Sequence, residues 1–105
     1  MAKPSKKFDC LCALRALGEE NRLRIVRLLI KKEHSVNEIV ATIHATQYNV
    51  SKHLKVLREA ALVEVTKQGQ QRVYALAEDF RSHLSENSNV LDLGCCQFHF
   101  DKLPK

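Results

Sequence analysis

The sequence predicts a mainly α-helical domain that carries one β-hairpin. The first observation is a helical stripe, because Val50, Leu54 and Leu57 recur at the spacing of one helix face. The second observation is a pair of alternating segments, 63–67 and 72–76, which flank a turn containing the only nearby glycine. With 105 residues, of which 45% are hydrophobic, the chain can form one compact domain.

The charge distribution favours an anionic partner. The formal net charge is +5, the basic excess lies in residues 1–77, and residues 78–105 hold more acidic than basic side chains. Nucleic acid fits better than a membrane surface, since no basic helix here has a broad exposed apolar face. The chain has no apolar run long enough to cross a bilayer and no signal-peptide core. We therefore expect a soluble, cytoplasmic protein with no membrane partner.

Apolar periodicity predicts two helices at the start of the domain. Residues 8–17 place an apolar side chain at every third position, and Gly18 ends this helix. Residues 21–30 turn their leucine, valine and isoleucine side chains inward, and most of their arginines outward. Two acidic residues precede the second helix, where they suit its positive N-terminal end.

A third and a fourth helix follow, joined by a tight turn. Ser35 is expected to cap a helix over 36–43, and Glu38, three residues on, completes a capping box. Thr46 caps the next helix, which runs towards Leu62. Two short helices joined by a tight turn, with the second polar and basic, are the pattern of a helix-turn-helix.

The fourth helix surrounds its apolar stripe with amides, hydroxyls and cations. Arginine and lysine can meet phosphates or guanine, and asparagine and glutamine can pair with adenine, although any solvated helix face also carries such residues. The candidate DNA-binding residues on this helix are Gln47, Tyr48, Asn49, Ser51, Lys52, His53 and Lys55. We expect Lys52 and Lys55 to contact phosphates, and Gln47, Asn49 and His53 to contact base edges.

The hairpin adds a second cationic projection, with Lys67, Gln70 and Arg72 at or near its tip. A hairpin directly after a helix of this kind suggests a winged helix, whose wing lies along the DNA backbone or an adjacent minor groove. We expect a flexible basic arm at 1–7, a winged-helix DNA-binding domain at 8–88 and a cysteine-containing C-terminal tail at 89–105.

Two other classes of function fit the sequence less well. A thiol oxidoreductase is disfavoured because there is no Cys-x-x-Cys, no βαβ pattern and no phosphate-binding loop. A winged helix used only for protein contacts is disfavoured by the basic wing and the polar fourth helix. We therefore expect no enzymatic activity, and no cofactor for DNA binding.

Two segments resemble the ArsR/SmtB family of winged-helix repressors. They are ALGEENRLRI at 16–25 and VSKHLKVLREA at 50–60, and the wing ending VYAL at 73–76 agrees with them. The resemblance covers about residues 8–80. It implies a homodimer whose first and last helices form the interface, and which represses by binding a palindromic double-stranded DNA operator until an inducer releases it.

Two inducer sites common in that family are not evident here. The resemblance places a Cys-x-Cys in the third helix, but this chain has no thiol between His34 and Asn37. Another group of relatives binds metal with Asp and His residues of the last helix. Here residues 78–86 offer only Asp79 and His83.

The four cysteines lie outside the helix-turn-helix, at Cys10, Cys12, Cys95 and Cys96. Clustered thiolates favour thiophilic ions, and similar family members use terminal cysteines for such ions. The candidate inducers are arsenite, antimonite, cadmium, lead and zinc, with His99 as a further ligand. We rank Cys95 and Cys96 first. Cys10 and Cys12 point about 200° apart on a helix, so they cannot both face one ligand unless the helix frays there.

Other interpretations of the thiols stay open. They could form a redox or persulfide switch, in which a helix-to-tail bridge is favoured over a strained Cys95–Cys96 pair. A purely structural disulfide is not expected inside a cell. Cys10 and Cys12 could also be small core residues. We expect the tail from Asn89 to Phe100 to pack on the dimer surface, as strand or irregular chain.

Overall fold

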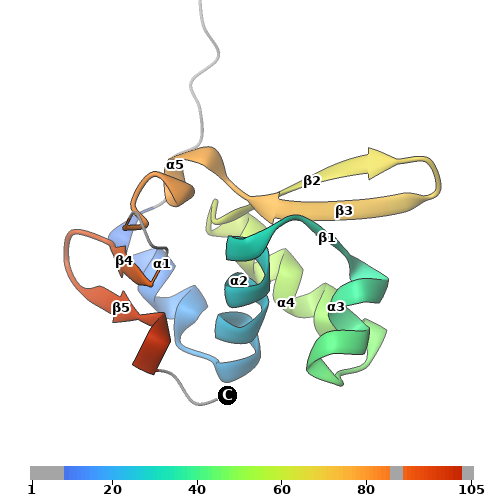
Figure 1. Ribbon diagram of the computed structural model, residues 1–105, viewed down its shortest axis with the longest axis horizontal. Helices are drawn as coiled ribbons and strands as arrows, with labels where there is room; N and C mark the ends of the chain where they lie inside the picture. Colours follow the sequence, from blue (N-terminus) through green and yellow to red (C-terminus); the bar gives the residue numbers. More distant parts are fainter. Residues whose placement is uncertain (1–8, 86–88, 103–105) are drawn as a thin grey trace, which may run out of the picture.

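The computed structural model describes residues 9–85 and 89–102 (Figure 1). Four helices precede the wing, and a short helix and a second hairpin follow it. The elements are α1 Cys10–Leu17, α2 Glu20–Lys31, β1 His34–Ser35, α3 Val36–Ile43, α4 Gln47–Glu59, β2 Val63–Gln68, β3 Gln71–Leu76, α5 Glu78–Arg81, β4 Val90–Asp92, β5 Gln97–His99 and the 3-10 helix η1 Phe100–Lys102.

Acidic N-caps set the starts of the first two helices. The carboxylate of Asp9 accepts a hydrogen bond from the backbone N–H of Cys12, so α1 begins at Cys10. Phe8, where we expected this helix to start, lies outside the described residues. The carboxylate of Glu19 accepts from the first backbone N–H groups of α2, which is therefore slightly longer than predicted.

The predicted capping box at the start of α3 is confirmed. The hydroxyl of Ser35 accepts from the backbone N–H of Glu38 at 3.2 Å, and the Glu38 carboxylate accepts from the backbone N–H of Ser35 at 2.8 Å. That backbone hydrogen bond, above all, holds the pKa of Glu38 below its ordinary value. His44 then turns the chain in the left-handed region, with a φ of 57°. Thr46 caps α4, which completes the predicted helix-turn-helix.

The wing is an antiparallel pair whose register runs from Val63 opposite Leu76 to Gln68 opposite Gln71. Each strand is one residue longer at the turn than predicted, because Gly69 takes a φ of 64° and closes a two-residue loop. The short strand β1 pairs with β3, which gives the sheet order β1-β3-β2. The sequence did not predict β1, since two residues carry no alternating pattern.

One hydrophobic core joins the helices to the base of the sheet. The predicted stripe of α4, formed by Val50, Leu54 and Leu57, is fully buried. It packs in one cluster with apolar residues of α1, α2, α3 and β2 and of the turn before β2, among them Leu17, Ile25, Leu29, Ile39, Leu62 and Val63. This packing turns the polar side of α4 outward. No described helix is long and apolar enough to cross a membrane.

The C-terminal region differs from the sequence-based expectation. The last helix, which the family resemblance places within 78–86, ends at Arg81. The backbone N–H groups of His83 and Leu84 then donate to carbonyls only three residues back. Strands β4 and β5 then form a hairpin beside α1 (Figure 1). Leu91, Leu93 and Phe100 are buried in the core of the same chain, and Arg27 donates to the Phe100 carbonyl at 3.1 Å. The tail therefore packs on the helices of its own chain as a strand pair, and its place relative to a dimer surface stays a prediction.

Candidate nucleic-acid interface and cysteine pair

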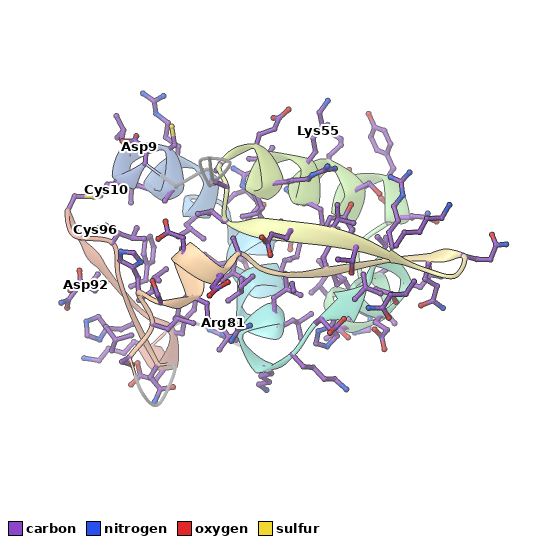
Figure 2. All side chains as sticks on the ribbon, turned by 90° about the horizontal axis from the view of Figure 1, so that it is seen from above. Asp9, Cys10, Lys55, Arg81, Asp92 and Cys96 are labelled. Atoms are coloured by element: carbon purple, nitrogen blue, oxygen red, sulfur yellow. A yellow bond between two sulfur atoms is a disulfide. The ribbon has the colours of Figure 1, made fainter. Side chains whose placement is uncertain are left out.

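The outer face of α4 presents most of the side chains that the sequence singled out. Because the opposite face is fixed in the core, this face is held in one orientation relative to the domain. Lys55 points away from the body of the molecule (Figure 2). The exposed predicted residues of this helix are Gln47, Tyr48, Asn49, Ser51, Lys52 and Lys55.

Tyr48 and Lys52 form a pair on the first turns of α4. The ammonium of Lys52 lies 5.3 Å from the centroid of the Tyr48 ring, a cation–π contact between residues four apart on the helix. Tyr48 is nevertheless 70% exposed. The contact holds an aromatic ring and a cation together on the exposed face of α4.

The wing concentrates positive charge at its tip. Lys67 and Arg72 are exposed and directly opposite each other across the two strands. Like charges in this position repel one another, and a bound anion would relieve the repulsion. Gln68 donates to the carboxylate of Glu33 at 3.1 Å, which ties the wing to the segment before β1.

An open groove of about 1900 Å³ joins the helix to the wing. It brings together five of the predicted DNA-binding residues, three from α4 and two from the hairpin. They are Gln47, Ser51, Lys55, Gln70 and Arg72. The predicted residues Tyr48, Asn49, Lys52 and Lys67 are exposed but do not line the groove. The groove as a whole is not cationic, because four acids line it beside three cations: Glu59, Glu64, Glu78 and Asp79 with Lys55, Arg58 and Arg72. The surface that suits a phosphate backbone is therefore the exposed face of α4 and the tip of the wing.

His53 differs from the other predicted residues of α4. Its side chain is only 19% exposed and lies against the start of α2. The Nδ1 atom is 3.3 Å from a guanidinium nitrogen of Arg22, and Nε2 is 3.4 Å from a carboxylate oxygen of Glu19. The ring is therefore engaged within the domain. A signal for this was present in the sequence, because His53 follows Val50 by three positions and so belongs to the inner stripe.

The cysteines form a disulfide between Cys10 of α1 and Cys95 of the tail hairpin (Figure 2). Their Cα atoms are 6.3 Å apart, within the range of disulfide-bonded cysteines. The turn that carries Cys95 is held by the Leu93 N–H, which donates to the Cys96 carbonyl at 2.9 Å. We did not expect a structural disulfide. The pairing found is the helix-to-tail bridge of the redox interpretation.

The other two cysteines are free thiols in different surroundings. Cys12 is exposed, and Cys96 is half-buried against the core. Cys10 and Cys12 thus diverge on α1, as the helical repeat predicts.

The cysteine region, as folded, does not fit a resident metal. Among residues 9–85 and 89–102, no three His, Cys, Asp or Glu side chains converge on a point where an ion could sit. The disulfide also occupies two of the four sulfur atoms. His99 is exposed on β5 and completes no such set with Cys95 and Cys96.

The helix-turn-helix, the polar outer face of α4 and the cationic wing define the class of winged-helix DNA-binding proteins. The family described as "Bacterial regulatory protein, arsR family" matches residues 19–65. The chain is 37% identical over 85 residues to the biofilm growth-associated repressor of Agrobacterium fabrum, covering 81% of this chain and 73% of that protein. It belongs to the ArsR/SmtB family of transcriptional regulators.

Two further comparisons agree. The chain is 37% identical over 71 residues to the HTH-type transcriptional repressor SmtB of Mycobacterium tuberculosis, covering 68% of this chain. It spans about half, 53%, of the length of that repressor. The structure of HlyU from Vibrio cholerae matches with a TM-score of 0.63 and 34% identity, over 65% of this chain and 74% of that chain.

Proposed function

We propose that the protein is a homodimeric transcriptional repressor that binds a palindromic double-stranded DNA operator, and that its operator affinity depends on the state of its cysteines. The single observation that carries the DNA-binding part is the exposed polar face of α4 beside the cationic tip of the wing. Two relatives whose names identify them as repressors support repression rather than activation of transcription.

In this proposal, α4 enters the major groove. Gln47 and Asn49 contact base edges, and Lys52 and Lys55 contact phosphates. Lys67 and Arg72 of the wing contact the backbone beside the major groove. The repulsion between these two cations supports an anionic partner at the wing, because a phosphate between them lowers their mutual energy.

The dimer is supported by the exposed apolar residues of α1. Leu11 is 53% exposed and Leu14 is 39% exposed, and both lie on the side of α1 that faces away from the core. Helix α5 has only four residues, so it offers little of the apolar surface that the family resemblance assigns to the last helix. We therefore assign the larger share of the dimer interface to α1.

The disulfide supports a redox switch as the sensory element. Two thiols, Cys10 and Cys95, give up two protons and two electrons to an oxidant of the peroxide class, which is reduced to water as the S–S bond forms. Closure adds a covalent link between the tail hairpin and α1, and reduction removes that link while the apolar packing of the tail remains. Because α1 contributes to the dimer and packs on the helix-turn-helix, the two redox states would differ in operator affinity, and DNA would shift the redox equilibrium by the same factor.

A second candidate is a thiophilic metalloid or metal, with arsenite first and antimonite, cadmium, lead and zinc as alternatives. The observation that favours it is a free thiol beside each end of the disulfide, at Cys12 and Cys96. Reduction would then offer four thiols on two adjoining segments, and His99 a nitrogen. Trivalent arsenic takes three thiolates, so this candidate requires the reduced protein.

Single-cysteine variants separate the two candidates. Binding of fluorescent DNA from the protein's own promoter is measured for the reduced protein, and again after peroxide or arsenite. A redox switch predicts that Cys95→Ser abolishes the peroxide response and that Cys96→Ser leaves it intact. A metalloid site at the tail predicts that both variants lose the arsenite response. Failure of the wild-type protein to bind any promoter fragment would rule out the proposed function.

A further inference from the structure

Three helices meet where His53 of α4 contacts the start of α2. The carboxylate of Glu19 caps α2 by accepting from the backbone N–H groups of Asn21 and Arg22. The same carboxylate lies 3.4 Å from Nε2 of His53. The imidazole ring of His53 thus connects α4 to the N-terminal end of α2.

Both ring nitrogens of His53 lie against side chains of the same domain. A guanidinium can only donate, so Nδ1 accepts from Arg22 at 3.3 Å and carries no proton in this contact. The other ring nitrogen, Nε2, lies 3.4 Å from a carboxylate oxygen of Glu19. Both ring nitrogens are occupied inside the domain, and the side chain is 19% exposed. A contact to a base edge would require both interactions to break.

Arg22 extends this contact to the helix that carries the disulfide. Its Nε donates to the carbonyl of Ala16, in the last turn of α1. One guanidinium therefore binds the backbone of α1 and the imidazole of α4 at once. The disulfide anchors the opposite end of the same short helix, at Cys10. Any movement of α1 that accompanies breaking this bond acts directly on the Arg22 side chain.

We propose that His53 is a positioning residue rather than a base-reading residue, and that Arg22 and His53 together couple the state of the Cys10–Cys95 bond to the orientation of α4. This inference rests on the proposed function. The guanidinium of Arg22 is planar and reaches two acceptors, the Ala16 carbonyl and the His53 ring, in fixed directions. The ammonium of lysine lacks this planar, branched arrangement of donors and cannot replace it. Arg22 contacts both α1 and α4 directly, so no further residue is needed to connect the two helices. The two helices and α2 also pack in one core.

The first test asks whether the contact exists without DNA. Urea unfolding is measured for wild type, Arg22→Gln, His53→Leu and the double variant, all in the oxidised form. The proposal predicts that the two substitutions are non-additive, because each alone already removes the shared contact. Additive effects would show that Arg22 and His53 do not interact, and would overturn the proposal whether or not the protein binds DNA.

The second test measures coupling, which a merely structural role would not change. The readout is the ratio of operator affinities in the reduced and oxidised forms, for which allosteric proteins typically show about 5–150-fold. His53→Leu and Arg22→Lys should bring this ratio to about one. His53→Gln should restore most of it, because the amide supplies one acceptor and one donor. The matched control Lys55→Ala should weaken both forms equally and keep the ratio.

The third test distinguishes positioning from base reading. Affinities of the His53→Gln variant are measured for a set of operators that each differ at one base pair. A positioning residue predicts the same order of affinities as in wild type. Loss of discrimination at one base pair would assign His53 to base reading, and a wild-type ratio in His53→Leu would also overturn the proposal. If wild type binds no operator, the proposed function fails, and the unfolding test still decides the contact.

Discussion

Cys10 and Cys95 are joined by a disulfide although 85 residues separate them in the chain. The bond connects the first turn of α1 to the tip of the tail hairpin, at the end of the molecule opposite the wing (Figure 1). The disulfide and the tip of the wing therefore lie at opposite ends of the molecule, and an influence of one on the other has to pass through the elements between them.

Closing so long a loop should stabilise the fold. Reduction of the wild-type protein is expected to lower its free energy of unfolding by about 2–4 kcal/mol, largely because the bond restricts the unfolded chain. Urea unfolding with and without reductant measures this difference. Cys95→Ser should be insensitive to reductant, whereas Cys12→Ser should respond as wild type does. Equal stability of both wild-type forms would refute the stabilising role of the bond.

Lys52 should contribute to the affinity for all DNA sequences. In the proposed homodimer, replacing it with alanine removes one phosphate contact from each subunit, so the slope of log K against log salt should become shallower by about 1.8. Titrations at several salt concentrations measure the slope. Lys102→Ala, in the tail, is the matched control and should leave the slope unchanged. A changed sequence preference with an unchanged slope would contradict the phosphate-binding role.

The cation pair at the tip of the wing should lower the stability of the free protein, because Lys67 lies opposite Arg72. Lys67→Glu places an acid opposite Arg72 and turns a repulsive cross-strand pair into an attractive one. The free protein should gain roughly 0.2–1 kcal/mol of stability, while operator affinity falls. Thermal unfolding and DNA titration measure the two effects. Lys102→Glu makes the same charge change in the tail, and an equal loss of affinity there would argue against a specific wing contact.

The capping box at the start of α3 should respond to pH. Because the folded-state pKa of Glu38 lies below its ordinary value of 4.5, the carboxylate stabilises the fold above that value. This contribution disappears as the pH falls through the lowered pKa. The stability difference between wild type and Glu38→Gln should therefore be present at neutral pH and vanish in acid. A difference that persists in acid would contradict this account.

The capping hydroxyl can be tested separately. Ser35→Ala removes the acceptor for the Glu38 backbone N–H, and it should cost about 1 kcal/mol at neutral pH. Urea unfolding at neutral pH measures the loss. Thr42→Ala is a useful comparison, because its exposed hydroxyl bonds only to a carbonyl of its own helix.

Local patterns in the sequence account for most of the fold. The stripe of Val50, Leu54 and Leu57 predicted the buried face of α4, and the Ser35–Glu38 box predicted the start of α3. Both features depend on residues a few positions apart. The wing was predicted for the same reason, since Gly69 lies between two alternating segments.

The remaining features depend on contacts between distant segments. The pairing of Cys10 with Cys95 requires the path of the tail, which no local spacing specifies. Strand β1 forms because β3 offers a free edge, and α5 ends early because the chain turns into the tail hairpin. His53 was predicted to face outward from its polar chemistry alone, although its helical position places it beside the core.

The central claim is that the cysteine pair regulates DNA binding by α4 and the wing. The most direct measurement compares operator affinities of the reduced and oxidised wild-type protein with those of the Cys10→Ser/Cys95→Ser variant, on DNA from its own promoter. We expect the two wild-type forms to differ by about fivefold or more, and the variant to bind equally under both conditions. Tight binding that is identical for both wild-type forms would leave a DNA-binding protein but contradict regulation by this pair.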